Sequence, residues 1–497
     1  MTIDTLFGWA LTVLVMAMVA PSIAPSWNLV WAAGLAGGLI ASLRVLSLDR
    51  RILAIGIVAC VTPMLVWTAL LTRTPPKLPG SFAITGLITA LPEPSTASQR
   101  LEIAVQQSSA SVLVGKTVTV FARDASVITP GQQVTCRCSV LTGSIDNAIY
   151  LAQLAKNRAI VLKSNEPLTI GAVDRSPRFW LLHLRTAIVQ RAYQLWPSPE
   201  SSLAAGLVVG SRESFSPSLT DAMQVTGTTH LVAVSGENVA VVLWVIGLFL
   251  PRKRPWVRLL VLGATVALFA LLTGGAASVW RAGVMATLLL LAAGLGRPVN
   301  SLRLLVIVAA FLTLVNPLAA RADLGYQLSF LAVFGIVTLA QPIANLLPLP
   351  RALALAIGTT LAATALTAPL IASTFGTVSL VSPIINVALE LIVNPALVLA
   401  AASIGASFAI PVIGRLFAWT SYLPLTVITR TIKYAATIPH ASATVALPPW
   451  VGWSCTFALV VLGVWIDQRS RVQSIDWTTR NASGILDRRT EDYVRTQ

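Results

Sequence analysis

The stretch HLVAVSGENVAVV at residues 230–242 places a compact group of polar residues at the start of a long apolar segment. The polar members are His230, Ser235, Gly236, Glu237 and Asn238. The apolar residues that follow predict a helix that enters a lipid bilayer, where polar groups need partners or water. We therefore expect Glu237 to face a bundle interior or a wet cavity, and Gly236 to permit a helix break or a close helix approach. The alternative is a helix mouth just outside the lipid.

The composition extends this prediction to most of the chain. Of 497 residues, 55% are hydrophobic and 11% are charged, and the mean hydropathy is +0.78. Such a chain is too apolar for an ordinary soluble fold, and apolar stretches near the roughly 20 residues that span a bilayer recur along it. The net charge of +16 invites a nucleic-acid partner, but in membrane proteins much of such an excess lies in cytoplasmic loops.

The N-terminal segment, residues 1–75, is predicted to hold three membrane helices. They lie near residues 6–20, 29–46 and 52–71. The turn between the second and third helices contains Arg44, Arg50 and Arg51, which places it in the cytoplasm by the positive-inside rule. The N-terminus is then cytoplasmic, and the chain after Thr72 emerges on the outer face of the membrane.

An extracytoplasmic β domain is predicted next, at residues 76–168, inserted after the third span. Its short β-rich pieces, separated by Gly, Pro and Ser, lie at residues 82–89, 101–105, 117–121 and 134–141. A small β-barrel fits this pattern. Cys136 and Cys138 lie in the last piece. We expect their side chains to point to opposite faces of a strand, so no disulfide is expected between them.

Residues 169–228 are predicted to form a connector with interfacial helices, among them an aromatic, arginine-bearing helix near 177–196. The main membrane domain follows at 229–466, where basic turns recur two spans apart. Its helices are expected near residues 230–250, 256–272, 278–295, 302–318, 326–339, 351–373, 380–401 and 451–466, with 408–428 ambiguous. The fold class is therefore a polytopic α-helical membrane protein of about 11–12 spans in the cell membrane. A cytoplasmic tail is expected at 467–497.

Two further strings place polar residues in or beside apolar helices. In SVWRAGVM, residues 278–285, Arg281 lies a few residues inside its helix, where it either snorkels to the interface or lines a pore and meets phosphate. In NPLAARADLGYQLSFLAVFG, residues 316–335, Asp323 precedes a helix that holds Gln327 and Ser329. The residues alone favour a helix cap for Asp323.

A last stretch, residues 375–395, is apolar but interrupted by glycine, proline and polar side chains. Asn386, Glu390 and Asn394 are among them. Broken helices with polar residues line transport paths in membrane proteins, and kinks that serve helix packing are the equally weighted alternative.

These strings, in this order, resemble the competence domain of the ComEC family: HLVAVSGENV, then SVWRAGVM, then DLGYQLSFLAVFGI, then FGTVSLVSPIINV. The preceding β-rich piece, which ends in DNAIYLAQLAKNRAIV, resembles the family's OB-like domain. The resemblance implies a channel that passes single-stranded DNA across the cytoplasmic membrane. It also implies three kinds of partner: a DNA receptor outside, a helicase-like ATPase or single-strand-binding proteins inside, and a second copy of the chain.

The resemblance also implies two sets of DNA-contacting residues. The channel path is assigned to His230, Ser235, Gly236, Glu237, Asn238, Arg281, Asp323, Gln327, Ser329 and Asn386. DNA binding in the OB-like domain is assigned to Lys116, Arg123, Arg137, Lys156 and Arg158. The basic residues of that domain only slightly outnumber its acidic residues, and it has few aromatic residues on which bases could stack.

The sequence departs from the family pattern in two places. Asn238 stands where many relatives have histidine, and the tail after Ile466 is too short for the metallo-β-lactamase-like nuclease domain that many relatives carry. No Cys/His zinc cluster or HxHxDH-like motif is visible, so we expect neither an enzyme nor a bound metal or cofactor.

Two other classes of function remain open from the residues. A transporter or flippase for a small or lipidic substrate would use broken helices and buried polar residues equally well. An intramembrane hydrolase with Ser235 as nucleophile and His230 as base is disfavoured. On a continuous helix these positions differ by roughly 140° of rotation and would not share a face.

Overall fold

The computed structural model describes thirteen stretches of the chain, which together cover most of the β domain and of the main membrane domain. These are residues 78–90, 93–95, 98–122, 130–140, 158–174, 179–211, 215–232, 236–251, 254–274, 277–294, 300–316, 323–445 and 447–466. The predicted N-terminal helices and cytoplasmic tail lie outside these residues.

The chain divides into two compact units, each built from several sequence segments. The first unit comprises Met1–Gln224, Thr228–Gln327 and Leu389–Ala436, and the second comprises Val225–Gly227, Leu328–Ala388 and Thr437–Gln497. The chain therefore passes between the units several times, and the long helices α14 (Leu324–Leu346) and α16 (Ser382–Ala409) contribute residues to both.

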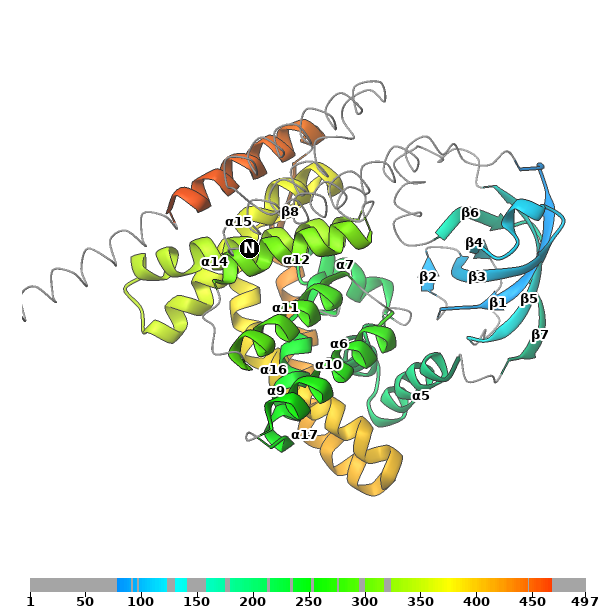
Figure 1. Ribbon diagram of the computed structural model, residues 1–497, viewed down its shortest axis with the longest axis horizontal. Coiled ribbons are helices and arrows are strands. Elements are labelled where there is room, and N and C mark those ends of the chain that lie inside the picture. The colour runs from blue at the N-terminus through cyan, green and yellow to red at the C-terminus, as the bar shows by residue number, and fades with distance from the viewer. Residues whose placement is uncertain are drawn as a thin grey trace, which may run out of the picture. The chain divides into compact units, whose positions relative to one another are not determined.

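The N-terminal part of the first unit is a small antiparallel barrel closed by one parallel pairing (Figure 1). Its strands are β1 (Phe82–Ile88), β2 (Glu93–Ser95), β3 (Ser98–Ser108), β4 (Thr117–Ala122), β5 (Gln132–Val140), β6 (Arg158–Ser164) and β7 (Thr169–Val173), with a 3-10 turn η2 (Ser111–Leu113) after β3. Five of them pair in the circular order β1-β3-β4-β6-β5, because β5 also pairs with β1. The four strands expected from sequence are confirmed, and β7 extends the sheet beyond residue 168.

Alternation of apolar side chains explains why these strands close around one core. Ile84, Leu101 and Val120 point inward and are fully buried. Gly86 follows a register shift in β1, and a methyl group there would overlap the backbone oxygen of Ala104 in β3. A side chain at this position would therefore separate two strands that the barrel needs in contact.

The cysteine expectation is wrong, because the structure joins Cys136 and Cys138 by a disulfide within β5. Adjacent residues on a strand point to opposite faces, but residues two apart point to the same face. Both side chains are buried in the barrel core, and their Cα atoms are 5.9 Å apart, within the range that a disulfide bridges.

Besides most of α16, helices make up the rest of the described residues of the first unit. They are α5 (Trp180–Leu195), α6 (Glu200–Val209), most of α7 (Pro217–Thr226), α8 (Thr229–Val232), α9 (Gly236–Phe249), α10 (Pro255–Leu272), α11 (Ala277–Gly294), α12 (Ser301–Val315) and α17 (Pro411–Ala436). Val239, Val266, Ala270 and Val279 form a shared core of α9, α10 and α11. Nine of the ten residues of α6 are buried, so this segment of the predicted connector is a core helix.

The second unit contains the larger part of α14, all of α15 (Arg351–Phe375), the start of α16, and the helix Pro449–Ile466. Leu339, Ala340, Ala362 and Leu366 form its core. Two short strands, β8 (Thr377–Ser379) and β9 (Ser442–Thr444), pair antiparallel beside these helices.

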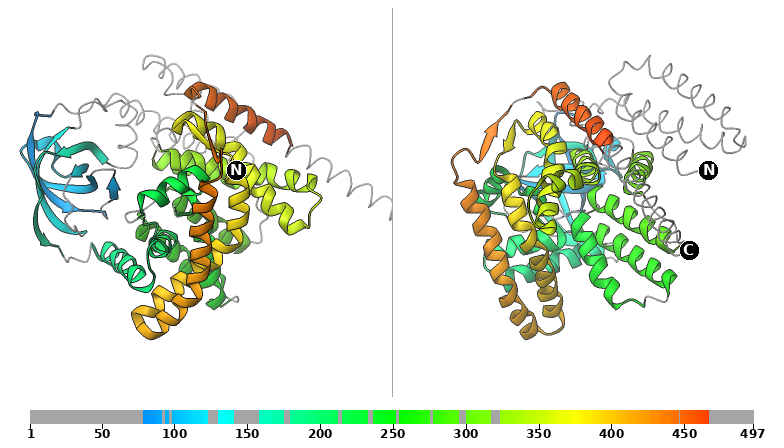
Figure 2. Two further views of the ribbon diagram at one scale, coloured as in Figure 1. Left: turned by 180° about the vertical axis from the view of Figure 1, so that it is seen from behind. Right: turned by 90° about the vertical axis from the view of Figure 1, so that its left-hand side faces the viewer.

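Five of the described helices are long and apolar enough to cross a membrane: α14, α15, α16, α17 and Pro449–Ile466. The region 408–428, ambiguous from sequence, contains the turn at Ile410 and most of α17, which forms a hairpin with α16 (Figure 2). Across this hairpin the Oγ atoms of Ser403 and Ser421 lie 3.4 Å apart. The apolar helices α9 and α12 have 14 and 15 residues. The count of 11–12 spans therefore remains a prediction.

Candidate functional site

The polar string at residues 230–242 lies where α8 ends at Val232 and α9 begins at Gly236. Gly236, Glu237 and Asn238 form the first turn of α9, and Ser235 lies outside the described residues. A helix that starts at this point leaves its first backbone N–H groups without partners from its own preceding turn. The first turn of α9 is therefore polar in both side chains and backbone.

Arg281 of α11 lies against this turn. Its side chain is 7% exposed, and a methyl group placed on Gly236 would be 3.1 Å from its Nη2 atom. Because glycine has no side chain, the guanidinium can approach the backbone of α9 closely. Arginine carries five donors in a planar fork that matches phosphate or carboxylate oxygens, so the turn can present a positive charge to an anion.

Asn238 fixes the turn from its other side. Its side chain is 4% exposed, and its Nδ2 atom donates a hydrogen bond of 3.1 Å to the backbone oxygen of Leu207 in the buried helix α6. The bond satisfies a buried amide and ties α9 to the core. In this structure Asn238 is a packing residue of the turn, next to the residues predicted to line a path.

Glu237 connects the turn to α16. Its Oε1 atom accepts a hydrogen bond from Nδ2 of Asn394, and the carboxylate of Glu390, one turn earlier on α16, is close enough to interact with it electrostatically. Pro395 follows Asn394 inside α16 and removes one backbone donor from the helix. The sequence marked Glu390 and Asn394 as interruptions of an apolar stretch, but nothing in it paired them with Glu237.

Asp323 caps helix α14, as the residues alone favoured. Its Oδ1 atom accepts a hydrogen bond of 2.9 Å from the backbone N–H of Gly325. The following Tyr326 is buried, donates a hydrogen bond of 2.8 Å to the backbone oxygen of Ala309 and contacts the hydroxyl of Thr313 at 2.8 Å. Tyr326 thereby joins α14 to α12, an anchoring role that sequence reasoning missed.

The remaining predicted path residues fall into different surroundings. His230 is exposed on α8, and Gln327 is buried on α14 in the first unit. Ser329 and Asn386 belong to the second unit, where Nδ2 of Asn386 donates to Oγ of Ser382 at 3.0 Å. The structure thus brings Gly236 and Arg281 into contact and joins Glu237 to Asn394.

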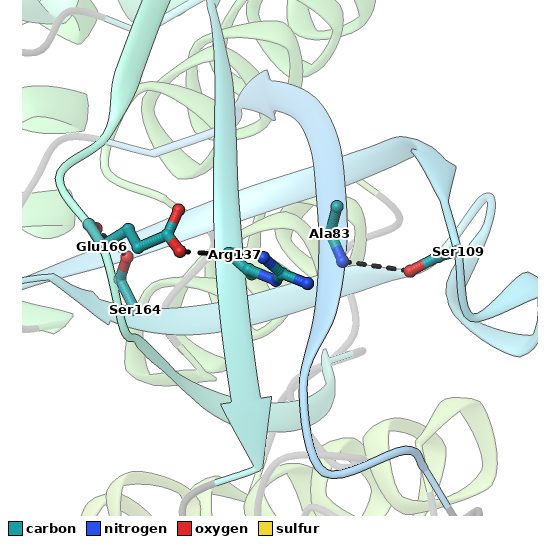
Figure 3. Close-up of polar contacts among 5 residues, drawn as sticks. All are labelled: Ala83, Ser109, Arg137, Ser164 and Glu166. Carbon is teal, nitrogen blue, oxygen red and sulfur yellow. Dashed lines mark hydrogen bonds and ion pairs between the residues drawn. The ribbon is translucent and has the colours of Figure 1, made fainter.

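On the barrel, three of the five predicted DNA-binding residues lie among the described residues. Lys116 precedes β4, and its neighbour Thr117 pairs with Arg158, so both residues belong to one end of the β4–β6 pair. Arg137 lies near the opposite end of β6, where its Nη1 atom is 3.9 Å from a carboxylate oxygen of Glu166 (Figure 3). Arg123 and Lys156 lie outside the described residues.

No group of three or more His, Cys, Asp or Glu side chains that could hold a metal ion occurs among the residues that the structure describes. The described side chains at the α9 turn are a guanidinium, two carboxylates and two amides. Such a set can bind and position charged groups.

Comparison with known proteins gives one family and one relative. Residues 207–470, more than half of the chain, match the family described as Competence protein. Over 167 residues the chain is 29% identical to ComE operon protein 3 of Bacillus subtilis (strain 168), which covers 32% of this chain and 21% of that relative. The matched stretch thus spans about a fifth of the relative's length. No solved structure matches the chain.

Proposed function

Because the chain belongs to the Competence protein family, we propose that it is a membrane channel that translocates single-stranded DNA across the cytoplasmic membrane during natural transformation. The observation that carries the proposal is the placement of Arg281, a buried cation on an apolar helix that contacts the first turn of α9. A charge in such surroundings is costly, and charged residues inside membrane domains generally serve transport paths, relays or ligand sites.

The physical role proposed for this contact is to replace water around the DNA backbone. Phosphate groups cannot enter lipid without partners for their charge, and a path lined by arginine and polar groups supplies such partners. In this proposal Arg281 attracts each passing phosphate, whereas Glu237 and Glu390 keep the attraction weak enough for the strand to move on. Gly236 leaves the room that the Arg281 guanidinium needs beside the first turn of α9.

The barrel is proposed to be an OB-like domain on the outer face that guides the incoming strand. The pair Lys116 and Arg158 supports this role, since cations at one end of a barrel can track a phosphate backbone. We further propose that the strand is received from an extracytoplasmic DNA receptor and drawn in by a helicase-like ATPase or by single-strand-binding proteins. The chain itself is proposed to bind and conduct DNA without cleaving it, alone or as a homo-oligomer.

The test is a deletion strain of a host shown to be competent, complemented with the wild-type chain or with Arg281→Ala, Arg281→Lys or Arg415→Ala. Arg415 is the matched control, because it is an exposed arginine on another apolar helix, α17. Transformation frequency and cytosolic arrival of labelled DNA are measured, together with the amount of each variant in the membrane.

We expect deletion to abolish cytosolic uptake and Arg281→Ala to lower it about 10-fold or more, since a buried charge-assisted contact is worth roughly 1.5–3 kcal/mol. Arg281→Lys should restore part of the uptake, and Arg415→Ala should match the wild type. Unchanged uptake on deletion would refute the channel and direct attention to a small or lipidic substrate. Normal uptake in Arg281→Ala, at normal membrane level, would remove Arg281 from the path.

A further inference from the structure

Helix α6 carries a buried carboxylate that the proposed channel does not use. Glu200 is the first residue of α6 and is only 6% exposed, although a charged side chain normally stays in water. Its hydrogen bond is to α17, and α5 and α8 also pack against α6. Trp196, just before α6, also contacts α17, with its Nε1 donating to the backbone oxygen of Ala418 at 3.0 Å.

Next to Glu200, one hydroxyl proton is shared between two acceptors. The hydroxyl of Thr429 on α17 lies 3.2 Å from Oε1 of Glu200 and 3.1 Å from the backbone oxygen of Thr426. A hydroxyl has one proton, so it can donate to one of these two acceptors at a time. Within the described residues, the contact with Thr429 is the polar contact that the structure gives this carboxylate.

Two further hydroxyl groups, on residues close in sequence to Glu200 and Thr429, have no hydrogen-bond partner within the described residues. Oγ of Ser201, the residue after Glu200, is fully buried, and so is Oγ1 of Thr426, one turn before Thr429 on α17. Serine and threonine inside helices usually donate to a backbone oxygen of the preceding turn, as Thr429 does. Hydroxyl oxygens that make no such hydrogen bond are available to a ligand.

Magnitudes show that the helix end alone does not balance the charge. A carboxylate at a helix N-terminus gains typically 0.3–1 kcal/mol from the helix dipole, and about 2 kcal/mol in favourable buried cases. Taking it out of water costs several kcal/mol even after the protein relaxes. One neutral hydroxyl adds roughly 1.5–3 kcal/mol as a hydrogen bond to a charged group, and here it is shared with a second acceptor. A positive ligand would make up the difference.

We infer that Glu200, Ser201, Thr426 and Thr429 form a binding site for a monovalent metal cation, Na⁺, between α6 and α17. One carboxylate matches one positive charge, and the other donors are neutral oxygens, the ligands that hard cations prefer. Membrane proteins place such sites at helix ends inside their bundles. The site holds α6 against α17, and this inference does not depend on what the chain transports.

The test uses the purified full-length chain in lipid nanodiscs, with thermal unfolding followed by tryptophan fluorescence. The midpoint Tm is measured in NaCl, KCl and choline chloride of equal ionic strength at fixed pH, and again in choline chloride over a range of pH. We expect Tm to rise saturably by several degrees in NaCl over choline chloride, because a ligand that binds the folded state stabilises it. Isothermal titration with NaCl gives the affinity directly.

Variants then assign the effect to this site. Glu200→Gln should abolish the sodium-dependent rise, and Thr429→Val should weaken sodium binding about 10-fold, the factor that corresponds to loss of a contact worth about 1.4 kcal/mol. Two controls keep the response: Asp221→Asn removes an exposed carboxylate, and Thr420→Val removes a hydroxyl of α17 that bonds only to Phe417 of its own helix. If Glu200→Gln does not fold, Thr429→Val and the titration decide alone.

Equal Tm in all three salts would overturn the inference, as would a sodium affinity in Thr429→Val equal to that of the wild type. A Tm that depends on pH but not on sodium, and loses that dependence in Glu200→Gln, would mean that the carboxyl holds a proton instead, which also overturns the sodium site. None of these outcomes bears on DNA uptake, so the channel proposal stands or falls separately.

Discussion

Two arginines of the first unit show how differently this chain uses the same side chain. Arg137 on the barrel has a side chain that is 63% exposed and faces Glu166 across 3.9 Å, whereas Arg281 is 7% exposed and packs against the start of α9. Water and salt screen the first charge, but they reach the second poorly. A count of basic residues gives both arginines the same weight, although solvent screens the charge of Arg137 much more than that of Arg281.

The barrel and the helices around α9 also differ in the contacts that stabilise them. The barrel depends on large aliphatic side chains that alternate along its strands into one core. The helices around α9 share a smaller apolar core, and the first turn of α9 is fixed in addition by single contacts, such as Gly236 against Arg281 and Asn238 with Leu207. Substitutions should therefore act on the barrel by volume and on the helices by the loss of a specific contact.

The largest energetic effect is expected from Leu101→Ala in the barrel core. Leu101 is fully buried on β3, and truncation of such a residue to alanine costs about 2–5 kcal/mol through lost burial and the cavity left behind. Thermal unfolding of the full chain measures the loss, with Val112→Ala, an exposed valine of the same domain, as control. Equal losses at both positions would mean that the barrel core is not formed as described.

Gly236→Leu should remove function at the helical site without unfolding the protein. The new side chain would displace the Arg281 guanidinium, and loss of a charge-assisted contact worth about 1.5–3 kcal/mol corresponds to a roughly 10- to 100-fold fall in transformation. Gly263→Leu on α10 is the matched control, because no heavy atom lies within 4 Å of where a methyl group would stand. Similar transformation by both variants would argue against a role for the Gly236–Arg281 contact.

Tyr326→Phe should have a moderate effect on stability. It removes the hydroxyl that joins α14 to α12, but Thr313 still donates to the backbone oxygen of Ala309 at 2.8 Å, so no acceptor is stranded. We therefore expect a loss of about 1 kcal/mol. Chemical denaturation in detergent measures it against Tyr422→Phe, which alters a more exposed tyrosine on α17. A loss above roughly 3 kcal/mol would indicate that the hydroxyl does more than the two bonds described.

The smallest effect is expected from breaking the pair between Arg137 and Glu166. Both side chains are mostly exposed, and exposed pairs contribute about 0.2–1 kcal/mol. A double-mutant cycle with Arg137→Ala and Glu166→Ala should give a coupling in that range that shrinks at high salt. A coupling above about 1.5 kcal/mol, insensitive to salt, would mean that the charge of Arg137 is not screened by solvent and that the two arginines do not differ in this respect.

Sequence patterns predicted elements better than contacts. Short β-rich pieces separated by glycine, proline and serine identified β1, β3, β4 and β5. Long apolar runs identified α15 within two residues, whereas α16 extends to Ala409, beyond the predicted end at residue 401. The polar string at residues 230–242 marked the place where α8 gives way to α9. These signals are local, since each depends on residues close together in the chain.

The misses have physical causes. Helix α6, ESSLAAGLVV, is short and begins with three polar residues, so it resembles a connector although tertiary packing buries it. The pairing of Glu237 with Asn394 spans 157 positions, and no local pattern encodes it. The disulfide between Cys136 and Cys138 was not expected, because the two side chains were assigned to opposite faces of the strand. Residues two apart on a strand share a face, so the two thiols can meet.

The small sheet of β8 and β9 bears on how the chain is made. Ser379 and Ala441, whose contact flanks this sheet, are 62 positions apart, and α16 and α17 lie between them. At ribosomal rates of about 5–20 residues per second, β8 waits roughly 3–12 seconds for its partner. During that interval the α16–α17 hairpin has both helices but no strand pairing at its base. Pairing of β8 with β9 therefore cannot precede synthesis of both helices, so the sheet is a late element of this part of the chain.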